Sequence, residues 1–239
     1  MGRKSAKIAN KKGAADKARS QVYTKALKDV FKASKSGGGD PDTNFLLRVA
    51  VERAKKFNVP KDNIEKAIKK GQGDDGAGFE DVTYEGFGPA GVAVFIEAST
   101  DNPTRTVANI RNYFKKCDGA LGVSGSLEFI FDRVALFVLP CQGIDEEELT
   151  LEVIDAGVED VKKVDDSFVL RGEMSEFGNI QEKLQELGVT PDEASLVRVP
   201  TSVKEVDDET ARESIEKLIE LLEEDDDVVA VYHNLASEN

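Results

Sequence analysis

The chain has 239 residues, of which 40% are hydrophobic and 33% are charged, and its formal net charge is −14. This apolar fraction is sufficient for packed cores, so the composition excludes an intrinsically disordered chain. No apolar run of about 18 residues is present and no apolar stretch follows the basic start, so we expect a cytoplasmic chain without a signal peptide and without contact with a membrane.

Charge is divided unevenly along the chain. Residues 1–73 hold 19 Lys and Arg against 7 Asp and Glu, a net charge of +12, whereas residues 74–239 hold 13 against 39, a net charge of −26. A basic head attracts polyanions and an acidic body repels them. The division therefore predicts that nucleic acid is bound by the head.

The basic head is predicted to be helical. Residues 14–36 carry apolar side chains at three- and four-residue spacing on one face, as an amphipathic helix does. A second helix with the same pattern begins after a cap at Asp42 or Thr43. A short third helix opens at Pro60 or Asp62, so the head reads as a small helical unit.

Lysine dominates the charge of the head, and we assign it to nucleic-acid contact. Residues 3–35 hold 11 Lys and Arg against only Asp16 and Asp29. A solvated helix face would mix the two signs, whereas phosphate contacts would explain the cost of concentrating like charges. The excess of lysine favours attraction to the backbone over reading of base edges. The predicted contact residues in the head are Arg3, Lys4, Lys7, Lys11, Lys12, Lys17, Arg19, Lys25, Lys28, Lys32, Lys35 and Lys61.

Beyond a Gly- and Asp-rich linker at residues 71–78, the pattern changes to alternating strands and helices. Strands are predicted at residues 79–85, 91–98 and 126–131. Between the second and the third of them, Asn102 is predicted to cap a helix. This part of the chain therefore reads as the start of an α/β domain.

Residues 133–200 follow the order β-α-β-β-α-β, which is the pattern of the ferredoxin-like fold. The predicted elements are a strand at 133–139, a helix at 145–156, strands at 158–164 and 167–172, a helix at 175–187 and a strand at 195–199. An acidic amphipathic helix at 207–224 and a strand at 228–234 complete the chain. The predicted fold class is therefore α+β.

A second basic patch lies on the first helix of the body. Residues 102–117 contain no acid, but they hold Arg105, Arg111, Lys115 and Lys116. Lys115 and Lys116 suit a helix C-terminus, whereas Arg105 stands in the first turn, where the helix dipole disfavours a cation. We therefore expect these four side chains to extend the nucleic-acid surface.

Two other motifs favour structural explanations over chemical ones. Residues 86–91 match G-x-G-x-x-G, but a strand pattern follows them instead of a helix, which favours a tight turn over nucleotide binding. Residues 223–227 are consecutive acids without the spacing of a calcium loop, which favours a solvated acidic turn after a helix. In a weaker alternative, this acidic run competes with nucleic acid for the basic head.

Metal sites and nucleophilic catalysis find little support in the sequence. Cys117 and Cys141 stand outside any C-x-x-C pattern, as free thiols do in a reducing compartment. His233 is the only histidine, which excludes His-pair and His/Cys metal sites. No acid and base can be assigned to one pocket, so we expect no enzyme, no cofactor, no metal and no small-molecule substrate.

Several stretches occur together and in a characteristic order. They are KARSQVYTK at 17–25, GGGDPDTN at 37–44, VPKDNIEKAI at 59–68, YEGFGP at 84–89, TDN at 100–102 with RTV at 105–107, and DDDV at 225–228 with VYHN at 231–234. On these stretches the chain resembles the YebC family over its whole length. Members commonly read Ser-Lys-Trp-Ala-Asn near the start, whereas residues 4–7 here read Lys-Ser-Ala-Lys and the chain has no tryptophan.

The resemblance implies three domains. They are a basic helical domain with its linker at residues 1–78, an α/β domain formed by residues 79–132 and 201–239, and a third domain inserted at residues 133–200. The family is described as DNA-binding transcriptional regulators and also as ribosome-associated translation factors. No member is an established enzyme.

Two functions therefore stay open at this point. The first is a non-enzymatic regulator of transcription that binds duplex DNA. The second is a translation factor that binds ribosomal or transfer RNA or the ribosome itself, since a lysine-rich surface suits recognition of shape and backbone. Against the first function, the head shows no clear helix-turn-helix sequence. Recognition of a palindromic site would also require a dimer, whereas a monomer is favoured.

Overall fold

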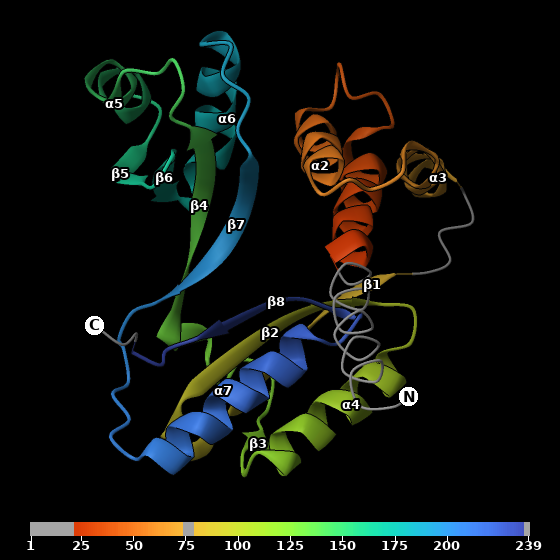
Figure 1. Ribbon diagram of the computed structural model, residues 1–239, viewed down its shortest axis with the longest axis vertical. Coiled ribbons are helices and arrows are strands. Elements are labelled where there is room, and N and C mark those ends of the chain that lie inside the picture. The colour runs from red at the N-terminus through yellow and green to blue at the C-terminus, as the bar shows by residue number, and fades with distance from the viewer. Residues whose placement is uncertain (1–21, 74–78, 237–239) are drawn as a thin grey trace, which may run out of the picture. The chain divides into compact units, whose positions relative to one another are not determined.

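The computed structural model describes residues 22–73 and 79–236, and it divides the chain into two compact units (Figure 1). The first unit comprises Met1–Gly78 with Glu224–Asp226, and the second comprises the rest of the chain. Seven predicted contact residues, Arg3, Lys4, Lys7, Lys11, Lys12, Lys17 and Arg19, lie outside the described residues. None of the helices in the described ranges is long and apolar enough to cross a membrane.

Three helices make up the described part of the first unit. They are the helix over residues 22–37, α2 (Phe45–Lys56) and α3 (Lys61–Gln72). Their inward faces bury a common core, in which Val30, Leu47 and Ala54 are fully excluded from solvent. The predicted helical head is confirmed, but α3 continues into the predicted linker and ends at Gln72.

The cap of α2 differs from the prediction. Asn44 is the N-cap, and the backbone N–H of Leu47 donates to its Oδ1 at 3.1 Å. Its Nδ2 donates backwards to the carbonyl oxygens of Ala33 and Gly38, at 2.8 Å each. The prediction of Asp42 or Thr43 is wrong because the buried Asn44 caps α2 and also holds the end of the preceding helix.

An antiparallel sheet of four strands forms the first part of the second unit. Its strands are β1 (Glu80–Phe87), β2 (Ala93–Thr100), β3 (Ala120–Leu121) and β8 (Val228–His233), in the order β3-β1-β2-β8. Two helices, α4 (Pro103–Lys116) and α7 (Glu209–Glu223), cover one face (Figure 1). Val94 and Ile96 of β2 pack there against apolar residues of both helices.

The predicted strand at residues 126–131 is wrong. Residues Glu128–Ile130 form a short 3-10 helix, η2, and the third strand is the two-residue β3. Leu127 and Phe131 are both buried on the far side of the first sheet, beside Phe95. In an extended strand Phe129 would lie on the same face as Leu127 and Phe131, but its side chain is 78% exposed, so the backbone between the two buried residues turns.

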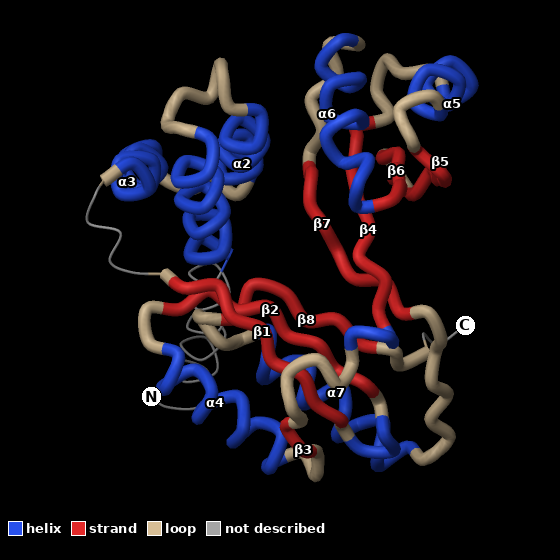
Figure 2. The backbone as a smooth tube through the Cα atoms, turned by 180° about the vertical axis from the view of Figure 1, so that it is seen from behind, coloured by secondary structure: helices blue, strands red, loops and turns tan. Residues whose placement is uncertain are grey.

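The second sheet has the predicted ferredoxin-like topology. Its elements are β4 (Phe131–Pro140), α5 (Glu146–Ile154), β5 (Val158–Val164), β6 (Ser167–Glu173), η3 (Met174–Glu176), α6 (Phe177–Glu186) and β7 (Glu193–Pro200). The strand order is β5-β6-β4-β7, with antiparallel neighbours throughout (Figure 2). These elements lie in sequence between β3 and β8, so the α+β fold with an inserted sheet is confirmed. The domain boundaries at residues 78, 132 and 200 stay a prediction.

The turn at the G-x-G-x-x-G match is confirmed. A short 3-10 turn, η1 (Pro89–Gly91), connects β1 to β2, and no helix follows it. The backbone N–H of Gly88 donates to the carbonyl of Val92 at 2.8 Å, and Gly91 has a φ of 74°. Ala90, with a φ of 55°, and Gly91 are both left-handed and together reverse the chain between the two strands. Glycine adopts this conformation without strain.

Candidate nucleic-acid interface

The four lysines predicted to share one face of the first helix have different surroundings. Lys35 is exposed, and Lys25 and Lys32 are partly exposed. Lys28 is only 7% exposed, and its Nζ donates to the carbonyl oxygen of Asp226, which belongs to the same compact unit. Because its ammonium group is buried and already hydrogen-bonded, Lys28 is not available to contact a phosphate, and the prediction that it does so is wrong.

Most cations of α2 are engaged by acids or rings of the same unit. Arg53 lies 3.9 Å from the carboxylate of Asp29, and Lys55 lies 2.6 Å from that of Glu52. Arg48 lies over the ring of Phe45, with 5.4 Å between its guanidinium carbon and the ring centroid. These contacts stabilise the helix and reduce the charge that α2 presents to a polyanion.

The second half of α3 is the most cationic described surface of the first unit. Lys66, Lys69 and Lys70 are exposed within five residues, with no acid among them. Lys35 joins them from the first helix, since its Nζ and that of Lys70 lie 5.9 and 6.0 Å from the ring centroid of Phe31. We call these four residues the lysine cluster. No ion pair is found between Lys35, Lys66 or Lys69 and a described carboxylate.

Close packing of two helices brings the lysine cluster together. The Ser34 hydroxyl donates to the carbonyl oxygen of Ile68 at 2.8 Å. At Gly71, a Cβ atom would stand 2.8 Å from the carbonyl oxygen of Phe31, so any side chain would push α3 away from the first helix. Gly71 therefore sets the distance at which Lys35 and Lys70 meet on one ring.

Sequence reasoning missed three members of this cluster. Only Lys61 was predicted on α3, and in the structure its Nζ lies 3.6 Å from Glu65, one turn along. The available signal was the spacing of Lys66, Lys69 and Lys70, which places all three opposite the buried Ile64. Three like charges on one exposed helix face, without alternating acids, indicate a surface for a polyanion.

The predicted basic helix of the body is α4, and its cations fall into two groups. Arg111, Lys115 and Lys116 are exposed on the outer face, opposite the buried Ile110. Arg105 instead lies beside carboxylates, with its Nη2 2.8 Å from Asp101. Arg111, Lys115 and Lys116 therefore present their charges to solvent, and none of the three forms an ion pair with a described carboxylate.

Asp227 is the second partner of Arg105 and explains why a cation stands in the first turn of α4. The Nη2 of Arg105 donates to Asp227 Oδ2 at 2.8 Å, and the hydroxyl of Thr106 donates to the same oxygen at 2.7 Å. Burial raises the pKa of Asp227, but the hydrogen bonds from Arg105 and Thr106 outweigh it and leave the pKa below its ordinary value. The charge of Arg105 is thus balanced within the fold.

The acidic run forms the predicted turn but is only partly solvated, since Glu223, Glu224 and Asp226 are exposed whereas Asp225 and Asp227 are buried. Asp225 and Asp227 are 8% and 7% exposed, and the backbone N–H of Ser99 donates to the carbonyl of Asp227 at 2.8 Å. The end of α7 at Glu223 agrees with the prediction. The two buried acids were missed because a run of acids ordinarily stays in water unless a cation from elsewhere in the chain pairs with it.

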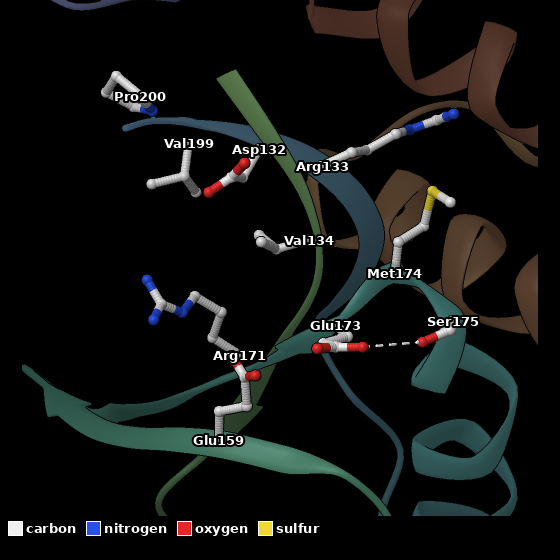
Figure 3. Close-up of a pocket in the computed structure, with 10 residues that line it drawn as sticks. All are labelled: Asp132, Arg133, Val134, Glu159, Arg171, Glu173, Met174, Ser175, Val199 and Pro200. Atoms are coloured by element: carbon white, nitrogen blue, oxygen red, sulfur yellow. Dashed lines mark hydrogen bonds between the residues drawn. The ribbon is translucent and has the colours of Figure 1, made fainter. Parts of the chain in front are cut away.

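A cavity of about 510 Å³ opens beside the second sheet (Figure 3). It is lined by Asp132, Arg133, Val134, Glu159, Arg171, Glu173, Met174, Ser175, Val199 and Pro200. The Ser175 hydroxyl lies 3.3 Å from Glu173 Oε2, and the guanidinium groups of Arg133 and Arg171 point in opposite directions. No group of three His, Cys, Asp or Glu that could hold a metal ion is found in the described ranges. We assign no reaction to this cavity.

Comparison with known proteins identifies relatives over nearly the whole chain. Residues 3–74 match the family model of the TACO1/YebC protein N-terminal domain, and residues 79–235 match that of the TACO1/YebC second and third domain. A probable transcriptional regulatory protein of Porphyromonas gingivalis is 47% identical over 219 residues, which cover 91% of this chain and 90% of that protein. A second probable transcriptional regulatory protein, from Thermoanaerobacter pseudethanolicus, is 43% identical over 236 residues, which cover 98% of this chain and 96% of that protein.

A solved structure has the same architecture. The crystal structure of a conserved hypothetical protein from Aquifex aeolicus is 38% identical in sequence and matches with a TM-score of 0.79. The match covers 92% of this chain and 92% of that one. The helical region followed by two sheets is therefore shared across the length of both proteins.

Proposed function

Because the chain belongs to the TACO1/YebC family, we propose that it is a non-enzymatic regulator of gene expression that binds duplex DNA through its first unit. Relatives over most of its length are named probable transcriptional regulatory proteins. The observation that carries the proposal is the lysine cluster, which is a concentrated positive surface on a chain of net charge −14. Phosphate oxygens offset the mutual repulsion of such lysines.

The outer face of α4 is proposed as a second contact. Arg111, Lys115 and Lys116 are exposed there within a unit that is otherwise strongly acidic. Acidic side chains elsewhere on that unit would repel a phosphate backbone, so they restrict where it can lie. Lys25 and Lys32 stay in the proposed interface as flanking charges, whereas Lys61 is left out because its Nζ is paired with Glu65 at 3.6 Å. Arg105 contributes to the interface chiefly by positioning the start of α4.

RNA is the second candidate polymer, and it is favoured by the fact that the cluster contains only lysines. All four members are lysines, which attract phosphate as point charges but lack the planar fork with which arginine reads guanine. Recognition by backbone and shape is what RNA helices require. A role in translation would follow if folded RNA displaced duplex DNA at equal phosphate concentration.

Removing the lysine cluster should abolish most of the binding. We expect the variant with Lys35, Lys66, Lys69 and Lys70 all replaced by alanine to bind a duplex DNA probe about 100-fold more weakly at low salt. If each lysine contacts one phosphate, the slope of log affinity against log salt should become shallower by about 3 to 4. Fluorescence anisotropy titrations at several salt concentrations measure both quantities. Alanine favours helix, so the fold should be retained.

A matched control separates a local surface from net charge. Lys55, Lys61, Lys162 and Lys183 each lie within 4.0 Å of a carboxylate, and their replacement by alanine changes the net charge by the same amount. We expect this control to bind within about threefold of the natural chain, because paired lysines release few counterions. Equal losses in the two variants would refute the lysine cluster as the binding surface.

A further inference from the structure

Helices cover the second sheet on one face. Phe137 of β4 is fully buried and stacks on Phe177 of α6, with 4.8 Å between the ring centroids. Val134, Leu136 and Val138 alternate with Phe137 along the strand, so they lie on the opposite face, where all three are partly exposed. The other two long helices of this unit, α4 and α7, cover the first sheet instead (Figure 1). We call the face that carries these three residues the open face.

The open face has an apolar centre. In an antiparallel sheet with one solvated face, apolar and polar side chains alternate along each strand, whereas β4 is apolar on both faces from Val134 to Val138. The apolar surface continues onto both neighbouring strands, because Val169 of β6 lies opposite Val138 and Val197 of β7 lies opposite Val134. A strand of this kind is typical of a sheet that is buried on both sides, which indicates that a partner covers the open face.

Carboxylates stand at one end of the open face, where the cavity of Figure 3 hollows it. Asp132, Glu159 and Glu173 line the cavity and are exposed, and none of them forms an ion pair with a described cation. Arg171 leaves these acids unpaired, and its Nε atom has no acceptor among the described residues. Arg133 points away from Arg171, as expected for a residue that alternates with Asp132 along β4. The three carboxylates are therefore available to a cationic partner.

Charge and width together select the chemistry of the occupant. The acids would repel a phosphate chain, and a second copy would bring the same acids together on a body whose residues 74–239 carry a net charge of −26. Lysine and arginine side chains would instead be attracted. The apolar strip spans β6, β4 and β7, which is about 10 Å across and matches the diameter of one α-helix.

We propose that the open face docks a basic amphipathic helix of a protein partner. The apolar residues of that helix pack on Val134, Leu136 and Val138, and its flanking lysines or arginines pair with Asp132 and Glu173. The inference is independent of the proposed function, because the lysine cluster lies in the other unit. Protein and nucleic acid would then be bound by different units of one chain.

A labelled peptide of leucine and lysine, about 18 residues long with its leucines on one helical face, is the probe. A peptide of the same composition in scrambled order controls for charge alone. In fluorescence anisotropy titrations we expect the full chain to bind the amphipathic peptide about 10-fold more tightly than the scrambled one, and Val134→Thr combined with Leu136→Thr to remove most of this difference. Threonine favours strands, so the sheet should be retained. Leu151→Gln with Ile154→Gln removes exposed apolar surface from α5 and should bind like the natural chain.

A second pair of variants tests the carboxylates without altering the apolar strip. Asp132→Asn with Glu173→Gln should bind the amphipathic peptide about 3- to 20-fold more weakly at low salt, the range expected for two exposed ion pairs. Glu213→Gln with Glu220→Gln removes the same charge from exposed positions of α7 and should bind within about twofold of the natural chain. Equal losses in the two variants would overturn the open face as the docking site.

The remaining outcomes separate this inference from its alternatives. Equal affinity of the natural chain for the two peptides would overturn the docking surface, and unchanged binding of duplex DNA would leave the lysine cluster standing. Self-association of the natural chain in analytical ultracentrifugation that is lost in Val134→Thr with Leu136→Thr would assign the open face to a second copy and would overturn the proposal as well. Binding of duplex DNA should be equal in all of these variants.

Discussion

Asp227→Asn should lower the free energy of unfolding of the second unit by about 2 kcal/mol at neutral pH. The substitution keeps the shape of a side chain that is only 7% exposed, but it removes the charge that accepts hydrogen bonds from Arg105 and Thr106. Hydrogen bonds to a charged group contribute about 1.5–3 kcal/mol, and here the partners would stay in place without it. Urea unfolding followed by far-UV circular dichroism measures the loss.

The effect of Asp227→Asn should depend on pH in a defined direction. The pKa of Asp227 is lower in the folded chain than in the unfolded chain, where it is about 3.9. Its contribution is therefore complete above about pH 4 and is lost as the pH falls through the folded pKa. We expect the difference in stability between the natural chain and the variant to be constant near neutrality and to shrink progressively in acid. A difference that stays constant down to pH 3 would contradict the assignment.

Asp101→Asn is the matched control for this network. Asp101 accepts from the same Nη2 atom of Arg105 at 2.8 Å, but its side chain is 58% exposed. Ion pairs in water contribute less than about 1 kcal/mol, so this variant should unfold at nearly the natural urea concentration. If the two variants were equally destabilised, the buried position of Asp227 would not be the cause.

The same network shows where sequence reasoning stops. Residues 223–227 were predicted to form a solvated acidic turn because they lack the spacing of a calcium loop and follow a helix. Asp227 is buried because Arg105, 122 residues away, pairs with it once β8 lies beside β2. Lys28 was likewise predicted to face a polyanion, although a carbonyl 198 residues away receives its ammonium group. The burial of a charge depends on a distant partner, and one sequence without its relatives does not reveal that partner.

Elements with a strong local signal were predictable. The α+β class, the order of the inserted sheet and the turn before β2 follow from hydrophobic periodicity and from glycine, which act over a few residues. The errors occurred where tertiary contacts override local preference. Asn44 was missed as the cap of α2 because its second role, at the carbonyl of Ala33, lies in another helix. The segment 126–131 was missed because it turns around a buried carboxylate.

That carboxylate belongs to Glu85, and its loss should have the largest effect on stability. The side chain is 2% exposed, with Oε1 accepting from the N–H of Gly125 at 2.7 Å and Oε2 from the N–H of Leu127 at 2.6 Å. Glu85→Ala would leave the N–H of the buried Leu127 without an acceptor in the interior and would return the N–H of the exposed Gly125 to water. At about 1–3 kcal/mol for an unsatisfied buried donor, we expect a loss of about 3 kcal/mol, a large part of the stability of an ordinary domain.

Hydrogen exchange can locate this loss on the loop itself. In Glu85→Ala the amides of Gly125 and Leu127 should exchange much faster than in the natural chain, whereas those of β2 should change only by the global destabilisation. Glu85→Gln should be almost as damaging, because an amide that accepts one N–H must turn its own NH₂ group toward the other. Glu128→Gln, an exposed acid on the same loop, should alter the free energy of unfolding by less than about 0.5 kcal/mol.

The substitution Glu85→Gln also tests whether the two units act separately. Duplex binding through the lysine cluster should persist under conditions where the variant is fully folded, because those lysines lie in the other unit. Protection of Gly125 and Leu127 that survived the substitution would show that the loop is ordered by something other than this carboxylate.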